Sequence, residues 1–102
     1  MIHVIATISL NPGTREEFLE VFRWLSPLVR KEQGCIEYQG TTDVPTTIPV
    51  QDALRQDVVT VVEKWASLDA LKAHGAAPHM AAYAARTRDL IASRVIHVLS
   101  PV

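Results

Sequence analysis

The chain has 102 residues, which is enough for one domain with its own core but too few for two. Apolar residues make up 48% and charged residues 21%, a balance that excludes a disordered chain. No apolar run approaches the roughly 20 residues of a membrane-spanning helix. The net charge is −1 with both signs scattered, so we expect a single domain over residues 1–102, with no nucleic-acid partner and no membrane partner.

The first residues, Met1–Ile5, show no basic leader and no small-residue cleavage site, so we expect no signal peptide. The one cysteine, Cys35, cannot form an intrachain disulfide, which is typical of a reducing compartment. We therefore expect a cytoplasmic protein, with Cys35 as a small buried thiol in preference to a nucleophile.

Residues 2–10 alternate between two sets of side chains and are rich in Ile and Val, which predicts a strand. Residues 11–13, Asn-Pro-Gly, end this strand. Residues 14–17, Thr-Arg-Glu-Glu, have the spacing of a capping box, so a helix is predicted from about Arg15.

The predicted helix has an apolar stripe at helical spacing. Pro27 interrupts it, because an interior proline removes one backbone hydrogen bond and clashes with the preceding turn, so we expect a kink or a break near Leu25. Gln33-Gly34 is expected to end the helical segment. The stripe consists of Phe18, Val21, Phe22, Leu25, Leu28 and Val29.

Residues 35–40 alternate as a second strand, with Ile36 and Tyr38 predicted to point inward. Residues 41–57 are expected to form a long loop. Such a loop could be a functional lid or an insertion, and the sequence favours neither.

Residues 58–65 are the strongest strand, and their near-continuous apolar character indicates that both faces of the sheet are covered. Helices on one side cover only one face, so we expect a second copy of the chain on the other.

Ser67 is a suitable N-cap for a short helix that runs to about His74, and Gly75 is expected to stop it. Pro78 suits the first turn of another helix, whose apolar positions continue to Leu90 and Ile91. Residues 94–99 are predicted to form the last strand.

The order strand, helix, strand, strand, helix pair, strand predicts an α+β, ferredoxin-like split βαβ fold. In this arrangement a four-stranded antiparallel sheet carries its helices on one face.

The chain contains no Gly-rich phosphate loop, no nucleophile elbow and no paired-cysteine site, so no common motif supports a nucleotide, flavin or zinc mechanism. His74 and His79 are five residues apart with Gly75 and Pro78 between them, so they do not share one face of a continuous helix. A two-histidine metal site and ordinary hydrogen-bonded histidines both remain open, and we favour no metal. His3 and His97 could be neighbours across the two terminal strands.

Glu63 and Trp65 are two residues apart on a strand and so share one face. A buried carboxyl group beside an indole would have a raised pKa and could act as a base, or it could be structural. Trp65 could be a stacking wall for an aromatic ligand or part of the core.

These residues also carry a resemblance to a known family. Glu63-Lys64-Trp65-Ala66-Ser67, then Asp69-Ala70-Leu71 and His74, then His79, resemble the E-x-W-x-S…a-L-x-x-H…H signature of the antibiotic-biosynthesis monooxygenase-like family. Residues 32–38, EQGCIEY, are similar to its E-x-G-C-x-x-Y element.

The resemblance implies a homodimeric α+β barrel, and oxygenation of quinols or polycyclic phenols without a metal, flavin or other cofactor. Haem-degrading relatives resemble one another in an Asn, Trp and His triad. The comparable places here look like Thr7, His74 and Ala84, which argues against haem degradation.

The resulting hypothesis is a cofactor-independent monooxygenase acting with O₂ on a quinol, anthrone or similar small phenolic substrate. His74 would be the base or an anion-stabilising donor, with His79 second; Trp65 and Tyr83 would be aromatic walls, with Glu63 beside the substrate and Arg86 as an anion partner. The alternative is a dimeric barrel that binds a small molecule without turnover, in a stress response or as an accessory protein.

Overall fold

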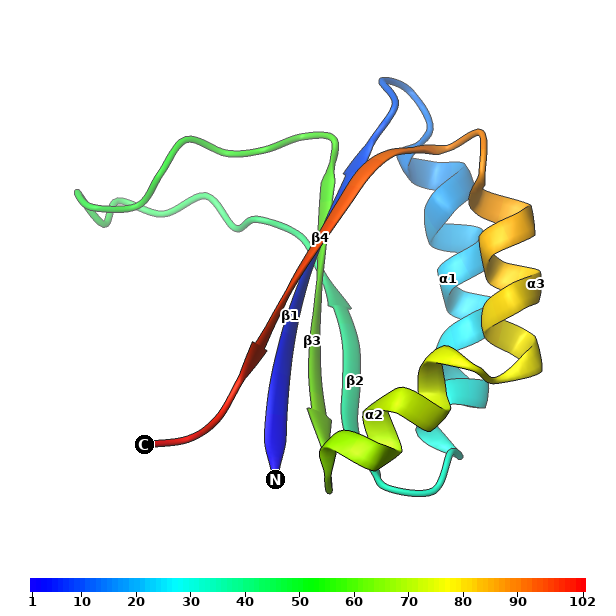
Figure 1. Ribbon diagram of the computed structural model, residues 1–102. Helices are drawn as coiled ribbons and strands as arrows, with labels where there is room; N and C mark the ends of the chain where they lie inside the picture. The colour runs from blue at the N-terminus through cyan, green and yellow to red at the C-terminus, as the bar shows by residue number, and fades with distance from the viewer.

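The computed structural model describes residues 1–102, which form one antiparallel sheet with three helices on one of its faces (Figure 1). The strand order is β2-β3-β1-β4, so the two central strands come from opposite halves of the chain. This is the predicted ferredoxin-like α+β fold. No helix combines the length and the apolar character that crossing a membrane requires. The elements are β1 (Ile2–Leu10), α1 (Arg15–Arg30), β2 (Cys35–Thr41), β3 (Val58–Trp65), α2 (Leu68–Gly75), α3 (Pro78–Thr87) and β4 (Ile91–Leu99).

The core lies between the sheet and α1. The even-numbered residues of β1 from Val4 onward and the odd-numbered residues of β3 face the helices and are buried, as the period of two predicts. From α1, Phe18, Leu25 and Val29 are fully enclosed. The predicted stripe is confirmed except at Leu28, which is exposed, while Ser26 is buried.

Helix α1 begins at Arg15, as predicted, but two other predictions about it fail. It runs unbroken through Pro27 to Arg30, so of the predicted kink or break near Leu25 the break is wrong. Packing of the apolar stripe on the sheet holds the helix together there. The capping box is also absent. Thr14 makes no side-chain cap bond, and its hydroxyl instead donates to the carbonyl oxygens of Asn11 and Leu90.

Two strands also differ. Ile36 is 55% exposed because the pairing of β2 with β3 is irregular between Cys35 and Glu37, which turns Ile36 away from the core. The last helix ends at Thr87, and β4 begins at Ile91, three residues earlier than predicted, where Ile91 pairs with Leu10.

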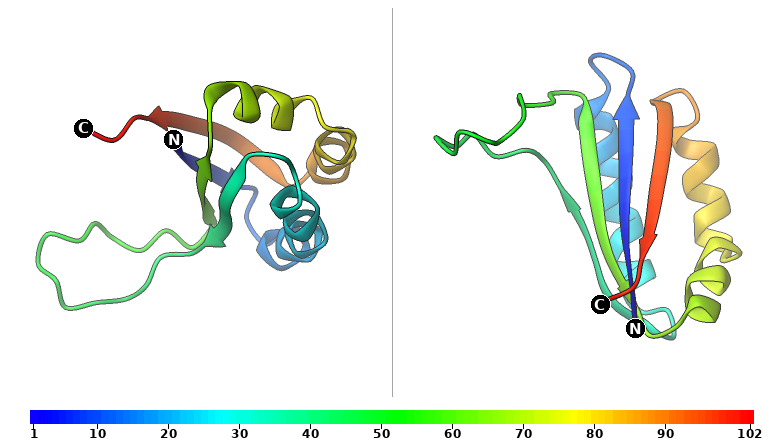
Figure 2. Two further views of the ribbon diagram at one scale, coloured as in Figure 1. Left: turned by 90° about the horizontal axis from the view of Figure 1, so that it is seen from below. Right: turned by 60° about the vertical axis from the view of Figure 1, so that its left-hand side comes forward.

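The long connection after β2 projects to the side of the sheet opposite the helices (Figures 1 and 2). Within it, the guanidinium of Arg55 donates to both carboxylate oxygens of Asp43, at 3.0 and 2.8 Å, and so joins the two ends of the connection. None of its residues lines the main cavity, so in this structure it is not a lid over that cavity.

Candidate active site

The main cavity lies between the sheet and the pair α2 and α3, and has a volume of about 430 Å³. It exists because the helix face above this part of the sheet carries small residues, which leave the space unfilled: Ala76, Ala77, Ala81 and Ala84. The sheet side is mostly valine, alanine and isoleucine. Arg94 and Ile96 line the cavity and are also exposed, so it opens to solvent beside β4.

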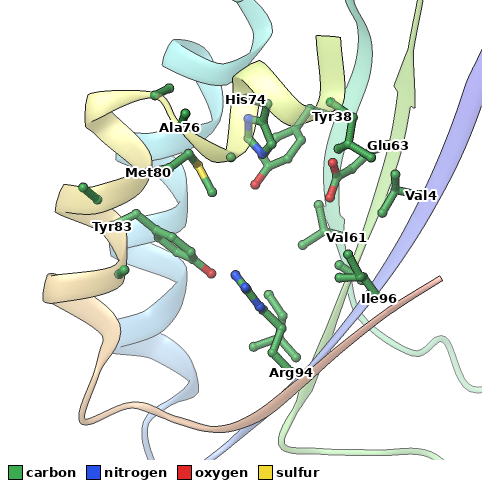
Figure 3. A pocket seen from close by; sticks show the side chains of 17 residues that line it. Val4, Tyr38, Val61, Glu63, His74, Ala76, Met80, Tyr83, Arg94 and Ile96 are labelled. Atoms are coloured by element: carbon green, nitrogen blue, oxygen red, sulfur yellow. The ribbon is translucent and has the colours of Figure 1, made fainter. Parts of the chain in front are cut away.

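Five polar side chains reach into this apolar space: Tyr38, Glu63, His74, Tyr83 and Arg94. Figure 3 shows the Tyr83 hydroxyl and the Arg94 guanidinium directed toward one another, with the other three on the opposite side of the cavity. A mostly apolar pocket with a few convergent polar groups is the usual form of a small-molecule site.

Several polar atoms of these side chains have no hydrogen-bond partner in the chain. They are Nε2 of His74, the second carboxyl oxygen of Glu63 and both tyrosine hydroxyls. The one side-chain atom that is both enclosed and unpaired is the Thr60 hydroxyl, on the open face of the sheet. The unpaired atoms at the cavity are therefore accessible to solvent, and a ligand in the cavity can form hydrogen bonds with them.

His74 is the last polar residue of α2. Ser67 is the N-cap of this helix, as predicted, and its side chain accepts a hydrogen bond from the Ala70 N–H. The His74 ring lies on the indole of Trp65, with 4.6 Å between ring centroids, and meets the Tyr38 ring edge to face. Nδ1 of His74 is 2.9 Å from Oε2 of Glu32. The ring is therefore fixed on three sides, and its remaining nitrogen is free.

Glu63 is buried on β3, and the Trp65 indole N–H donates to its Oε1 over 2.9 Å. The sharing of one face by these two residues is thus confirmed. Burial raises the pKa of Glu63 above its usual 4.5, against the opposing effects of the Trp65 hydrogen bond and the positive charge of Arg94. Glu63 is accordingly more easily protonated than an exposed glutamate.

The two tyrosines remain neutral at ordinary pH. Burial, reinforced by the nearby Glu63 carboxyl, raises the pKa of Tyr38, and burial raises the pKa of Tyr83 to about 12 although Arg94 opposes the shift. Both phenols are therefore hydrogen-bond donors toward a ligand.

Three of the residues predicted for the site line the cavity, namely Glu63, His74 and Tyr83. Trp65 is fully enclosed beneath His74 and supports the site without lining it. His79 does not line the cavity either; its Nε2 is 2.7 Å from the same Glu32 oxygen that His74 contacts.

Arg86 lies outside the cavity, where its guanidinium covers the Trp24 ring at 4.5 Å. The cation at the cavity is Arg94, which forms no ion pair within the chain. Sequence reasoning missed Arg94, Tyr38 and Glu32 as site residues. The alternation of the last strand, which puts Arg94 on the same face as Ile96, was the available signal.

The histidines form no metal cluster: no group of three or more His, Cys, Asp or Glu side chains is arranged to hold a metal ion. His3 and His97 lie on neighbouring strands on the open face, where they pair with Leu99 and Ile5.

The four-stranded antiparallel sheet, with its helices on one face and an apolar cavity between the two layers, places the chain among the small ferredoxin-like α+β proteins. Within that class the chain belongs to the antibiotic biosynthesis monooxygenase family, which it matches over residues 1–86.

The relatives agree with this assignment. The chain is 33% identical over 103 aligned residues to the probable quinol monooxygenase YgiN of Escherichia coli K12, with 99% of this chain and 98% of YgiN covered. A candidate antibiotic biosynthesis monooxygenase from Caulobacter crescentus is 35% identical, with a TM-score of 0.83 and 99% and 89% of the two chains covered. PA3566 from Pseudomonas aeruginosa shares the fold, with a TM-score of 0.82 at 24% identity over 99% and 93% of the chains. Family and relatives together support a monooxygenase-like function.

Proposed function

We propose that this protein is a cofactor-independent monooxygenase that oxidises a quinol, anthrone or similar phenol with O₂. The observation that carries the proposal is the unpaired Nε2 of His74 at the wall of an apolar cavity. A volume of about 430 Å³ lies within the range of ligand pockets, roughly 300–1,000 Å³, and suits a substrate of two or three fused rings.

In this proposal Nε2 of His74 takes a proton from the phenol or from the acidic carbon of the anthrone. The resulting anion gives one electron to O₂, and the two radicals combine into a C–O bond. The resulting peroxide anion takes the proton back from His74. Loss of water from this hydroperoxide then leaves a carbonyl, so that one oxygen atom stays in the product and the other leaves as water. The protein supplies the base, orientation and a surrounding field that favours the anion.

The remaining cavity groups would hold the substrate. Arg94, which lines the cavity, would pair with the developing negative charge, a role that the sequence suggested for Arg86. Tyr83 would donate to a substrate oxygen and pack against a ring, and the free oxygen of Glu63 would contact a polar group of the substrate from β3. His79 would act through Glu32, and Trp65 would support the His74 ring.

The same proposal includes a homodimer in the cytoplasm. The face of the sheet away from the helices carries exposed apolar side chains on β4, including Val95 and Leu99, and the partly buried Val62 on β3. A second copy stacked on this face would remove them from water.

Oxygen uptake with anthrone and with 2-methyl-1,4-naphthohydroquinone tests the activity, measured against the spontaneous oxidation of each compound. With ¹⁸O₂, a monooxygenase places one labelled oxygen atom in the product. His74→Gln should abolish the protein-dependent rate, and Glu20→Gln, an exposed change on α1, should retain it. Binding of both compounds without uptake above background would favour the non-catalytic binding protein.

A further inference from the structure

We propose that Glu32 is the positioning residue for His74, which it holds in the one tautomer that leaves Nε2 free as an acceptor in the cavity. This inference rests on the proposed function, in which His74 Nε2 is the base. Glu32 itself does not line the cavity, so its role would be exerted through His74.

Glu32 lies in the turn between α1 and β2, and it joins two helices that are distant from it in sequence. Its Oε2 is 2.9 Å from Nδ1 of His74, at the end of α2, and 2.7 Å from Nε2 of His79, at the start of α3. Only 14% of the Glu32 side chain is exposed, so water competes weakly for these bonds. One carboxylate oxygen thus ties together both sides of the α2–α3 joint.

The tautomers follow from the chemistry of the carboxylate. An ionised carboxylate only accepts hydrogen bonds, so His74 must carry its proton on Nδ1 and His79 must carry its proton on Nε2. The lone pair of neutral His74 is then on Nε2, the nitrogen without a protein partner. In the opposite tautomer, Nδ1 would face the Glu32 oxygen with its lone pair, and Nε2–H could not accept a proton from the substrate.

The charge of Glu32 also matters once His74 has taken the proton. The groups that surround the imidazolium are Glu32 from the α1–β2 turn, His79 from α3, Tyr38 from β2 and Glu63 from β3, with the cation Arg94 on β4. Among these groups, Glu32 is the carboxylate in direct contact with the ring, since its Oε2 lies 2.9 Å from Nδ1 of His74. A charge-assisted hydrogen bond of this kind is about twice as strong as a neutral one.

Histidine nitrogen NMR tests the tautomer without any substrate. In protein labelled with ¹⁵N-histidine, the His74 signals are identified by their loss in His74→Gln. We expect wild-type His74 to show a protonated Nδ1 and an unprotonated Nε2. Glu32→Ala should move His74 toward the Nε2–H form, which free histidine prefers. A wild-type His74 protonated on Nε2 when neutral would overturn the proposal.

Glu32→Gln removes the negative charge of the side chain but keeps an oxygen that accepts hydrogen bonds. It is also the milder substitution and can be used if Glu32→Ala does not fold. Its amide oxygen can still accept from both histidines, so the tautomer should be retained. With anthrone, kcat should fall about tenfold or more, with KM changed less than about threefold. The reason is that a neutral amide stabilises the His74 imidazolium, which forms only during the reaction, less than the carboxylate does. Glu20→Gln, an exposed change of the same charge on α1, is the matched control.

The outcomes separate the two proposals. If wild type consumes no oxygen with either compound while His74 has the expected tautomer and Glu32→Ala changes it, the oxygenase function falls and the positioning role stands. If wild type is active and neither Glu32 variant changes kcat or the tautomer, the positioning role is wrong and the oxygenase function stands.

Discussion

Oε1 of Glu63 accepts a 2.9 Å hydrogen bond from the indole N–H of Trp65, two residues further along β3. The bond is buried and uses one oxygen, which leaves the other facing the cavity. A carboxyl group held this way is both part of the core and available to a ligand. The raised pKa of Glu63 therefore has consequences for stability as well as for binding.

The first prediction concerns the pH dependence of stability. Because its folded pKa is raised above 4.5, Glu63 favours folding below about pH 4.5, and this contribution is lost as the pH rises through the folded value. Glu63→Gln should be more stable than wild type near neutral pH, with the difference shrinking in acid. Urea unfolding from about pH 4 to about pH 8 measures this. A Glu63→Gln protein that is less stable at neutral pH and keeps the wild-type pH dependence would contradict it.

The second prediction concerns the Tyr83 hydroxyl, which has no partner in the protein and stays protonated because its pKa is raised to about 12. Tyr83→Phe should leave the free energy of unfolding within about 0.5 kcal/mol of wild type and weaken binding of 2-methyl-1,4-naphthoquinone by about three- to tenfold. Calorimetric titration and urea unfolding measure the two effects. Unchanged affinity would show that the hydroxyl does not contact this ligand.

The third prediction separates the two arginines. Arg94→Gln should weaken binding of anionic 2-hydroxy-1,4-naphthoquinone about tenfold and leave binding of the neutral 2-methyl compound within about twofold, since only the former gains a charge-assisted bond. Arg86→Gln, which removes the contact with Trp24, should leave both affinities unchanged. The reverse pattern would return the anion-binding role to Arg86.

The fourth prediction concerns assembly through the open face. Val95 is 53% exposed in the single chain, so Val95→Glu should not disturb the folded subunit, but it would place a charge in the proposed interface. Wild type should sediment as a dimer and Val95→Glu as a monomer at about 10 µM. Leu68→Glu is the matched control, because it also replaces an exposed apolar residue with glutamate but lies at the start of α2, outside the proposed interface. This variant should remain dimeric. A monomeric wild type would contradict the proposed dimer.

The fifth prediction compares two glycines with nearly equal backbone angles. Gly13 has φ of 82° with nothing within 4 Å of an added Cβ, whereas Gly34 has φ of 85° and its added Cβ would lie 2.6 Å from Cβ of Ala70. Gly13→Ala should cost about 1 kcal/mol of unfolding free energy, and Gly34→Ala about 1–3 kcal/mol more, because it adds a clash to the strain. Equal losses in urea unfolding would show that α2 moves aside freely.

The elements that the sequence predicted well are those whose signal is local. The alternation of residues 2–10 and 58–65, the stripe beginning at Phe18 and the cap at Ser67 each depend on neighbours within a few residues, and all are present in the structure. The matched signature around Glu63 and His74 indicated the family for the same reason. Pro27 was misjudged because a local rule was overruled by packing against the sheet.

The arrangement of the site depended on contacts between distant segments. Glu32 and His74 are 42 residues apart, and nothing in the spacing of the two histidines indicates that one glutamate oxygen joins them. Whether Arg86 or Arg94 faces the cavity is decided by the end of α3 at Thr87 and the pairing of β4 with β1. The sequence by itself determined the order of the elements and which residues could do chemistry. Only the tertiary structure decided which of them meet, because side-chain direction depends on strand register and on how the helices pack over the sheet.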